Sequence, residues 1–313
     1  MATASLHLLR DRVHHTWSRE HEPVLSVASG TELTVETQDA SGGQLNPLST
    51  RQSVAELDFS RVNPVTGPVF VQGAAPGDVL QVDILAVEPG TFAWTAIIPG
   101  FGLLADQFPD PWIHVWELGG SAAAFTDGIR VPLQPFCGVL GLAPAEPGSH
   151  SVIPPRRVGG NMDTRQLGAG TTLFLPVEVD GALFGVGDTH AAQGDGEVCG
   201  TAIEGAMTAS LRLSVRRDLA IDTPEFEVTR PLERASAAAA GYHATTGVGP
   251  DLMQATRHCV ERMIAYLEHR HGLSPEEAYA LCSVAVDLRI SEVVDAPNWV
   301  VSAFLPGDLF VRA

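Results

Sequence analysis

The densest cluster of residues that can do chemistry lies in an otherwise apolar stretch, at residues 187–197. Its polar side chains are Asp188, His190, Gln193, Asp195 and Glu197. Carboxylates and an imidazole at one strand end form a ligand set that suits Zn²⁺, Mn²⁺ or a similar divalent ion. The same residues also suit a polar hairpin tip that needs no metal, because no zinc template of the HExxH kind is present.

Local geometry explains why these side chains should meet. A strand expected at residues 182–186 leads into the cluster, and continued extended geometry would place Asp188 and His190 on one face. The Asp-Gly pair at residues 195–196 is a hairpin-turn signal. We therefore expect Glu197 to return on the next strand and to face the other two side chains.

A second polar cluster occupies a long irregular stretch at residues 146–163. Its polar members are Glu146, His150, Arg156, Arg157, Asn161 and Asp163. Long loops on a rigid scaffold often carry binding residues, and adjacent glycines let a backbone approach a ligand closely. A surface loop with arginine–carboxylate pairs is the alternative.

Two further segments are candidates for the wall of a cleft. Asp39 and Gln44 flank a glycine pair, either as an Asx turn or at the edge of a cleft. Residues 94–106 are apolar and interrupted by glycine, which fits a pocket wall as well as core packing.

A thiol nucleophile is the chemical alternative to a metal site. Cys199 is close in sequence to His190, and Cys137 is also followed by glycine. A reactive thiolate needs a nearby histidine or a helix N-terminus, whereas a cysteine with apolar neighbours is usually inert and buried.

The composition excludes several classes of function. The net charge is -18 (Asp+Glu 37, Lys+Arg 19), which argues against nucleic-acid and anionic-membrane partners. All 19 basic residues are arginine. Without lysine there is no Schiff-base nucleophile, no phosphate-loop lysine, and no Ser–Lys or Glu–Lys–Cys amidase chemistry.

The compartment is predicted from the cysteines and from the start of the chain. Four cysteines are scattered without a CxxC pair, and no apolar stretch of signal-peptide length occurs in residues 1–26. No run reaches the ~18 apolar residues of a membrane span. We expect reduced thiols and a cytoplasmic protein.

The elements that must position these residues are mostly strands. Across residues 23–215, short apolar runs are separated by Gly and Pro, which is typical of a sandwich or barrel. The expected strands lie at residues 24–27, 33–36, 69–72, 79–87, 173–179, 209–215 and 299–304.

The pattern changes past Gly241, within the part of the chain that we expect to be α+β. Apolar spacings of three and four predict a helix at about 250–271, and Ser274-Pro-Glu-Glu277 is a capping box that starts a second helix ending near 288. Residues 233–241 are either a linker or a short helix. We therefore expect one unit, 1–313, with a mainly β region at 1–215 and an α+β region at 216–313.

Seven motifs together resemble the acetamidase/formamidase family over nearly the whole chain. They lie at residues 39–45, 94–106, 144–148, 154–157, 160–163, 187–200 and 295–299. The resemblance implies a mainly β fold, a distorted sandwich with a small α+β part containing the C-terminal helical hairpin. It also implies an amidohydrolase that converts small aliphatic amides to a carboxylate and ammonia, with γ-lactam ring opening as a related activity.

The resemblance also implies a divalent metal, zinc being the usual suggestion and calcium the alternative. We expect Asp163, Asp188 and His190 to be the metal ligands. The expected catalytic residues are Glu197, as the general base and acid, then Asp195 and Glu146, and the expected substrate-binding residues are Asn161, Gln193 and Trp94. The site would lie in a small, largely apolar pocket walled by residues 94–104.

Two alternatives remain open at this point: a γ-lactam hydrolase using the same site, and a non-catalytic β-sandwich protein that binds a metal or ligand. The exposed strand edges typical of β folds favour a homo-oligomer.

Overall fold

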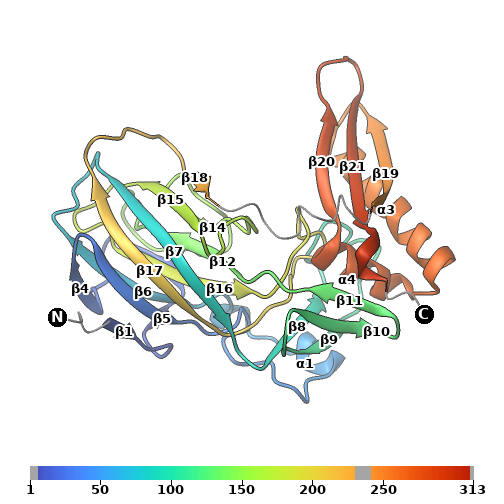
Figure 1. Ribbon diagram of the computed structural model, residues 1–313, viewed down its shortest axis with the longest axis horizontal. Helices are drawn as coiled ribbons and strands as arrows, with labels where there is room; N and C mark the ends of the chain where they lie inside the picture. Colours follow the sequence, from blue (N-terminus) through green and yellow to red (C-terminus); the bar gives the residue numbers. More distant parts are fainter. Residues whose placement is uncertain (1–5, 230–240, 311–313) are drawn as a thin grey trace.

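The computed structural model describes residues 6–229 and 241–310. The predicted linker or short helix at 233–241 therefore lies outside the described residues, apart from Gly241. Figure 1 shows a broad body built of strands, next to which a narrower arm rises from the C-terminal part of the chain.

Two sheets of six strands each form the body. In hydrogen-bonded order, the first contains β1 (Leu6–Leu8), β5 (Thr31–Glu36), β17 (Met207–Arg216), β7 (Val79–Pro89), β15 (Thr171–Pro176) and β18 (Glu225–Val228). The second contains β14 (Gly159–Asn161), β12 (Phe136–Gly141), β16 (Phe184–His190), β6 (Val65–Gln72) and β2 (Val13–His14), and β4 (Leu25–Ala28) also pairs with β6.

The two sheets pack face to face because their strands alternate in polarity. Along β17, buried positions alternate with half-buried ones, as a strand with one face in a core requires. One cluster of buried side chains draws on both sheets: Leu33, Leu80, Val82 and Leu211 from the first, and Val69, Leu140, Phe184 and Val186 from the second. Each fully buried side chain of this kind stabilises the fold by about 1.5–3 kcal/mol. The predicted distorted sandwich is confirmed.

A second core lies beside the sandwich. Its strand pairs are β8 (Phe92–Ile97) with β9 (Trp112–Glu117), and β10 (Ala122–Thr126) with β11 (Ile129–Pro132). Buried side chains from these pairs pack against both long helices of the C-terminal part. The short elements of the fold are the strand pair β3 (Thr16–Trp17) and β13 (His150–Ser151), the helix α1 (Arg51–Ala55), and the 3-10 helices η1 (Phe59–Arg61) and η3 (Gly307–Leu309).

The predicted helical hairpin is present. Helix α3 (Leu252–His271) ends at Gly272, whose φ of 69° is left-handed, and the capping box from Ser274 to Glu277 starts α4 (Pro275–Ala285). The predicted end near 288 is wrong. Val286 is already extended, because the chain enters β20 (Asp287–Glu292) directly.

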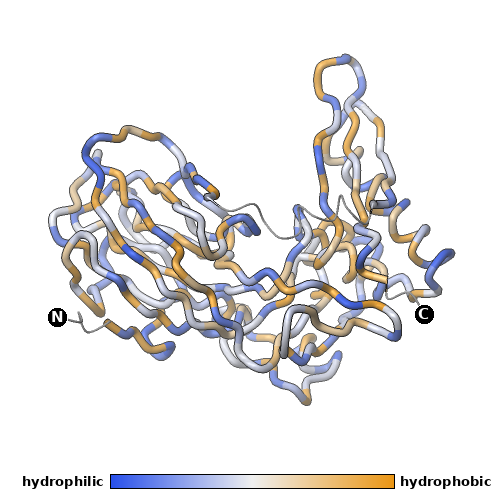
Figure 2. The backbone as a smooth tube through the Cα atoms, viewed as in Figure 1, coloured by the Kyte–Doolittle hydropathy of each residue, from blue (hydrophilic) through white to orange (hydrophobic). Residues whose placement is uncertain are grey.

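The arm is a sheet of three strands in the order β19 (Tyr242–Gly249), β21 (Trp299–Pro306) and β20, against which α3 packs. Polar and apolar residues alternate along most of β20, and Figure 2 shows both kinds in the arm. Among the described residues, no helix combines the length and the apolarity that crossing a membrane requires.

Candidate active site

A cavity of about 410 Å³ opens where β16, β14 and β8 end. Its polar lining includes Asn63, Asn161, Asp163, Asp188, Glu197, Thr201 and Glu204. Its apolar lining includes Leu57, Phe59, Val62, Trp94, Ile98, Phe101 and Ile153. Side chains from both predicted polar clusters and from the predicted apolar wall therefore meet in one place.

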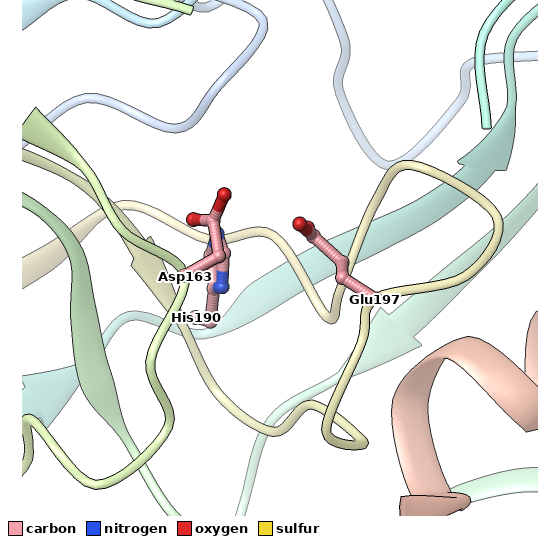
Figure 3. Close-up of side chains that lie close together, drawn as sticks. All are labelled: Asp163, His190 and Glu197. Carbon is pink, nitrogen blue, oxygen red and sulfur yellow. The ribbon is translucent and has the colours of Figure 1, made fainter. Parts of the chain in front are cut away.

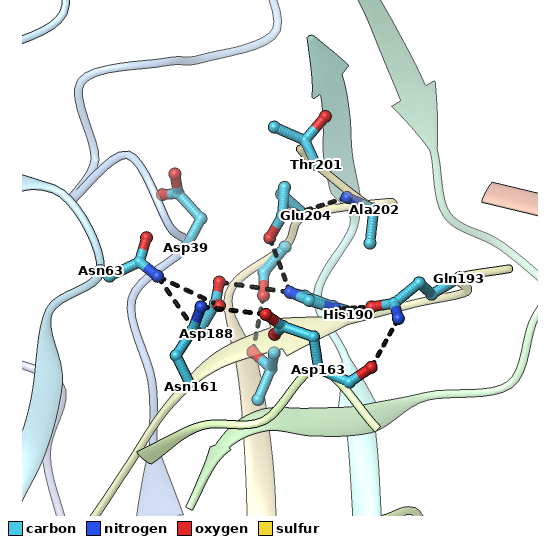
Figure 4. A network of polar contacts seen from close by, with 12 residues as sticks. Asp39, Asn63, Asn161, Asp163, Asp188, His190, Gln193, Thr201, Ala202 and Glu204 are labelled. Carbon is cyan, nitrogen blue, oxygen red and sulfur yellow. Dashed lines mark hydrogen bonds and ion pairs between the residues drawn. The ribbon is translucent and has the colours of Figure 1, made fainter. Parts of the chain in front are cut away.

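His190 is the centre of the polar side. It is the last residue of β16, and its side chain is fully buried (0% exposed). Its Nε2 lies 3.2 Å from Asp188 Oδ1 and 3.1 Å from Glu204 Oε2. On the other side of the ring, Nδ1 lies 2.9 Å from the Gln193 carbonyl oxygen, Oε1 (Figure 4). Because the Gln193 amide nitrogen donates to the Asp163 carbonyl, its Oε1 faces the ring and accepts from Nδ1, and Nε2 faces the two carboxylates.

We name as the cage His190 and the four acids around it, Asp163, Asp188, Glu197 and Glu204. Asp163 and Glu197 form its other side. Figure 3 shows both carboxylates directed into the same space beside His190. The Asn161 amide donates to Asp163 Oδ2 at 2.9 Å, and the Gln193 amide donates to the Asp163 carbonyl at 2.6 Å. Gln193 thus connects the loop that carries Asp163 with His190.

The cage is built from strained backbone. Six non-glycine residues have positive φ within the described part of the chain, and four of them line the cavity. They are Asn63 (46°), Asp163 (44°), Asp188 (46°) and Glu197 (44°). A left-handed conformation costs a non-glycine residue about 1–3 kcal/mol, and such residues cluster at functional sites. Here the strain turns three carboxylates toward one another.

Burial perturbs the acid–base behaviour of the whole cage. Burial and the charge of Asp163 raise the pKa of Glu197 well above its usual 4.5. Burial, followed by the charge of Asp188, also raises the pKa of Asp163. Burial alone would lower the pKa of His190, but the negative charges of Glu204 and Asp188 outweigh it and raise that pKa. Two buried acids (Asp188 and Glu204), two half-buried acids (Asp163 and Glu197) and one imidazole require protons or a cation to offset their charge.

The residues present fit a divalent cation. Among the described residues, four buried polar atoms of the cage have no hydrogen-bond partner: Asp163 Oδ1, Asp188 Oδ1, His190 Nε2 and Glu204 Oε2. The ligand atoms of Asp188, His190 and Glu204 lie within 4.8 Å of one another, as do those of Asp163, His190 and Glu197. One nitrogen with several carboxylate oxygens is a donor set that suits a divalent cation such as Zn²⁺ or Mn²⁺.

Gly138 shows how closely the cage is packed. It lies on β12, and its register neighbours Cys137 and Val139 pair with Thr189 and Gly187 of β16. A Cβ atom at Gly138 would lie 2.7 Å from Asp163 Oδ1 and 2.9 Å from His190 Cε1. The absence of a side chain at this position is what lets the carboxylate and the imidazole approach each other.

The structure brings together most of the site residues expected from the sequence. Those that line the cavity are Asp163, Asp188, Glu197, Asn161 and Trp94, and His190 lies directly behind them. Gln193, expected to bind substrate, is 2% exposed and instead holds His190. The Trp94 ring faces the cavity, while its N–H donates to Asp39 at 3.0 Å.

Asp195, expected to be catalytic, does not reach the cavity. It pairs with Arg165 Nε at 3.0 Å, and Arg165 Nη2 pairs with Asp287 at 3.0 Å. This triad, in which Arg165 and Asp287 are buried and Asp195 is half-buried, joins the loop after β16 to β20. Glu146, the other expected catalytic residue, is exposed, and its backbone carbonyl lies 3.1 Å from the His150 ring.

The predicted hairpin at residues 195–196 is wrong. Glu197 lies in an irregular loop instead of a returning strand, because Gly194 donates to Ser283 of α4 and Gly200 donates to the Glu197 carbonyl. The contact with α4 turns the chain before it can pair with β16.

The residue that does return opposite His190 is Glu204, which sequence reasoning missed. An antiparallel bridge pairs Glu204 with His190, and another pairs it with Trp94. Asn63 was also missed, and its amide lies 3.3 Å from both Asn161 Oδ1 and Asp188 Oδ2. Glu204 offered only a weak signal, an acid in an apolar run.

The thiol alternative finds no support. Cys199 is fully buried, and its sulfur donates to the Ala96 and Thr201 carbonyls. Burial raises the pKa of Cys199, so the thiolate is disfavoured.

The chain is similar to known amide hydrolases along almost its whole length. The model of the Acetamidase/Formamidase family matches residues 3–151 and 147–312. A formamidase of Methylophilus methylotrophus is 26% identical over 96% of this chain and 89% of the relative, and an acetamidase of Mycolicibacterium smegmatis is 30% identical over 60% and 62%.

Solved structures give the same relationship. A gamma lactamase from Delftia acidovorans superimposes with a TM-score of 0.89 at 26% identity, covering 96% of this chain and 90% of the relative. An acetamidase from Bacillus halodurans has a TM-score of 0.69 at 33% identity, covering 96% and 97%. The chain therefore belongs to the acetamidase/formamidase family and is an amidase, a hydrolase of the carbon–nitrogen bond in linear amides.

Proposed function

We propose that this amidase hydrolyses small neutral amides with a water molecule activated inside the acidic cage, releasing ammonia and a carboxylate. One observation carries the proposal: Glu197 and Asp163 face a common space beside His190, within a cavity open to substrate. A purely structural metal site would have no need of a pocket beside it.

A divalent cation completes the cage. Asp188, His190 and Glu204 would hold it. Asp163 lies with Glu197 on the other side of His190. We infer zinc in preference to calcium, because calcium takes 6–8 oxygen ligands and this set contains an imidazole. When bound, zinc lowers the pKa of water to about 7 and polarises a carbonyl.

Glu197 is the general base and acid in this mechanism. Its carboxylate accepts a proton from water and donates it to the amide nitrogen, which makes that nitrogen a viable leaving group. The raised pKa of Glu197 suits this exchange, because it makes the carboxylate a stronger proton acceptor than an ordinary glutamate. The Asn161 amide holds Asp163, and the Trp94 ring supports the substrate.

Ammonia release from formamide and acetamide tests the activity, and an inactive protein would favour the non-catalytic binding module. Glu197→Gln should lower kcat by 10²–10⁴-fold with metal content unchanged. Glu146→Gln is the matched control, because that acid is exposed and outside the cavity. Unchanged turnover after complete metal removal would contradict the metal-activated water.

Ring opening of γ-lactams is the second candidate. The gamma lactamase from Delftia acidovorans superimposes better than the Bacillus halodurans acetamidase, with TM-scores of 0.89 and 0.69. The ratio of kcat/KM for a γ-lactam to that for a linear amide decides between them.

We further propose a cytoplasmic homo-oligomer. Strand β18 lies at a sheet edge with all four residues exposed, and the arm exposes Ile290 (61%) and Val294 (81%). Light scattering on the purified protein would give its mass, and a monomer at all concentrations would contradict this proposal.

A further inference from the structure

The cavity is larger than formamide or acetamide requires. A liquid water occupies about 30 Å³, so a cavity of about 410 Å³ has room for roughly a dozen groups of that size. An amide head, a cation and a water molecule fill roughly half of them. The sequence predicted a small pocket, and the structure instead leaves space for a substantial acyl group.

The remaining lining is apolar. We name as the apolar wall Leu57, Phe59, Val62, Ile98, Phe101 and Ile153, which come from three separate segments of the chain. Two of its aromatic rings, Phe59 (57% exposed) and Phe101 (40%), remain in contact with solvent. Exposed aromatic rings next to a cavity offer apolar surface that a substrate can cover.

The charge of the cavity restricts the acyl group further. Its lining contains four acids, Asp163, Asp188, Glu197 and Glu204, and no arginine among the described residues. The ligand atoms of these acids form two groups that share His190, so the acids are confined to one patch. An anionic acyl group would be repelled by this patch and would find no basic partner on the apolar wall.

We infer that the preferred substrates are neutral primary amides whose acyl group is an apolar chain or ring of roughly six carbon atoms. This inference rests on the proposed amide hydrolysis at the same site. The amide head lies against the acidic patch, and the acyl group displaces water from the apolar wall. Formamide and acetamide can be hydrolysed at the same site, but their acyl groups are too short to displace water from the apolar wall.

A series of amides tests the inference: formamide, acetamide, butanamide, hexanamide and benzamide, with anionic succinamate as the charged counterpart of butanamide. Because each buried methylene contributes a factor of about four and hexanamide has four more than acetamide, kcat/KM should rise by roughly 200-fold from acetamide to hexanamide. Succinamate should fall at least tenfold below butanamide.

Two variants assign the effect to the apolar wall. Phe59→Ala removes an exposed ring and should lower the ratio of kcat/KM for hexanamide to that for acetamide by at least fivefold. Leu48→Ala is the matched control, because Leu48 is also exposed (88%) and lies in the same region without lining the cavity. Ile98→Phe fills the cavity and should lower the same ratio. Measuring both substrates on one preparation cancels any loss of folded protein.

The outcomes separate this inference from the proposed function. Turnover of acetamide with no gain for hexanamide or benzamide would overturn the inference and leave the amidase mechanism standing. Turnover of no amide at all would overturn both. A gain for hexanamide that Phe59→Ala and Ile98→Phe leave unchanged would overturn the assignment to the apolar wall.

Discussion

A single added methyl group at Gly138 should disable the acidic cage. A Cβ atom there would lie 2.7 Å from Asp163 Oδ1, 2.8 Å from the Asp188 carbonyl oxygen and 2.9 Å from His190 Cε1, whereas ordinary contacts begin at 3.4 Å. The surrounding atoms must therefore move by about 0.5–0.7 Å. Gly138 has no positive φ, so alanine is compatible with its backbone and the effect reports on the cage alone.

The expected magnitude follows from these displacements. Overpacking of this kind costs about 1–3 kcal/mol of unfolding free energy. A shift approaching 1 Å in a reacting group costs about 10²-fold in rate. Gly138→Ala should therefore fold, with kcat for amide hydrolysis reduced about 100-fold and metal content reduced.

The assay combines ammonia release, metal analysis and urea unfolding on the same preparation. Gly119→Ala is the matched control, because a Cβ atom there meets nothing within 4 Å. A Gly138→Ala enzyme with unchanged kcat and a full complement of metal would refute the proposal that Asp163 and His190 must approach this closely for catalysis.

Three other results are expected. Asp195→Asn should lower the unfolding free energy measured in urea by roughly 1–3 kcal/mol, because it leaves the buried Arg165 with one fewer charged partner. The kcat per folded molecule should stay within twofold. A large loss of kcat would show that Asp195 is catalytic after all. Gln193→Leu should weaken metal binding 10–100-fold in a chelator competition, because the His190 ring loses the acceptor that orients it. An unchanged affinity for the metal would show that packing alone orients the ring. Burial lowers the pKa of His14 to about 4, so the unfolded state binds a proton at this histidine at a higher pH than the folded state does. The unfolding free energy should therefore fall as the pH drops from 6.5 toward 4, by at most roughly 3 kcal/mol. Urea unfolding across this range should give that slope, and a His14→Asn variant with the same slope would assign it to other groups.

Much of the fold follows from local pattern. The strands β7 and β17 and the helices α3 and α4 were predicted from periodicity and caps, since these signals lie within the segment itself. The end of α4 was misplaced because apolar residues recur after Ala285, at Val286 and Leu288, and no Gly or Pro interrupts the sequence there. Residues 287–291 alternate between polar and apolar, and residues 287–292 form a strand because they pair with β21.

The candidate site was only partly predictable. Asp188 and His190 meet because they are two residues apart on one strand, and this spacing can be read from the sequence. Asp195 was misjudged because its ion pair with Arg165 is a non-local contact, and an acid resembles a catalytic acid until its partner is known. Glu204 was missed because its antiparallel bridge to His190 is a non-local contact.

The sequence by itself determined the strand and helix pattern, the polar clusters and the absence of lysine chemistry, because each is a property of composition or of near neighbours. Only the tertiary structure decided which acids share the cage, that Gln193 orients His190, and how large a cavity lies beside them. The physical reason is that burial of charge is collective. The pKa of a carboxyl group, and its need for a cation, depend on every group folded around it, and those groups come from distant parts of the chain.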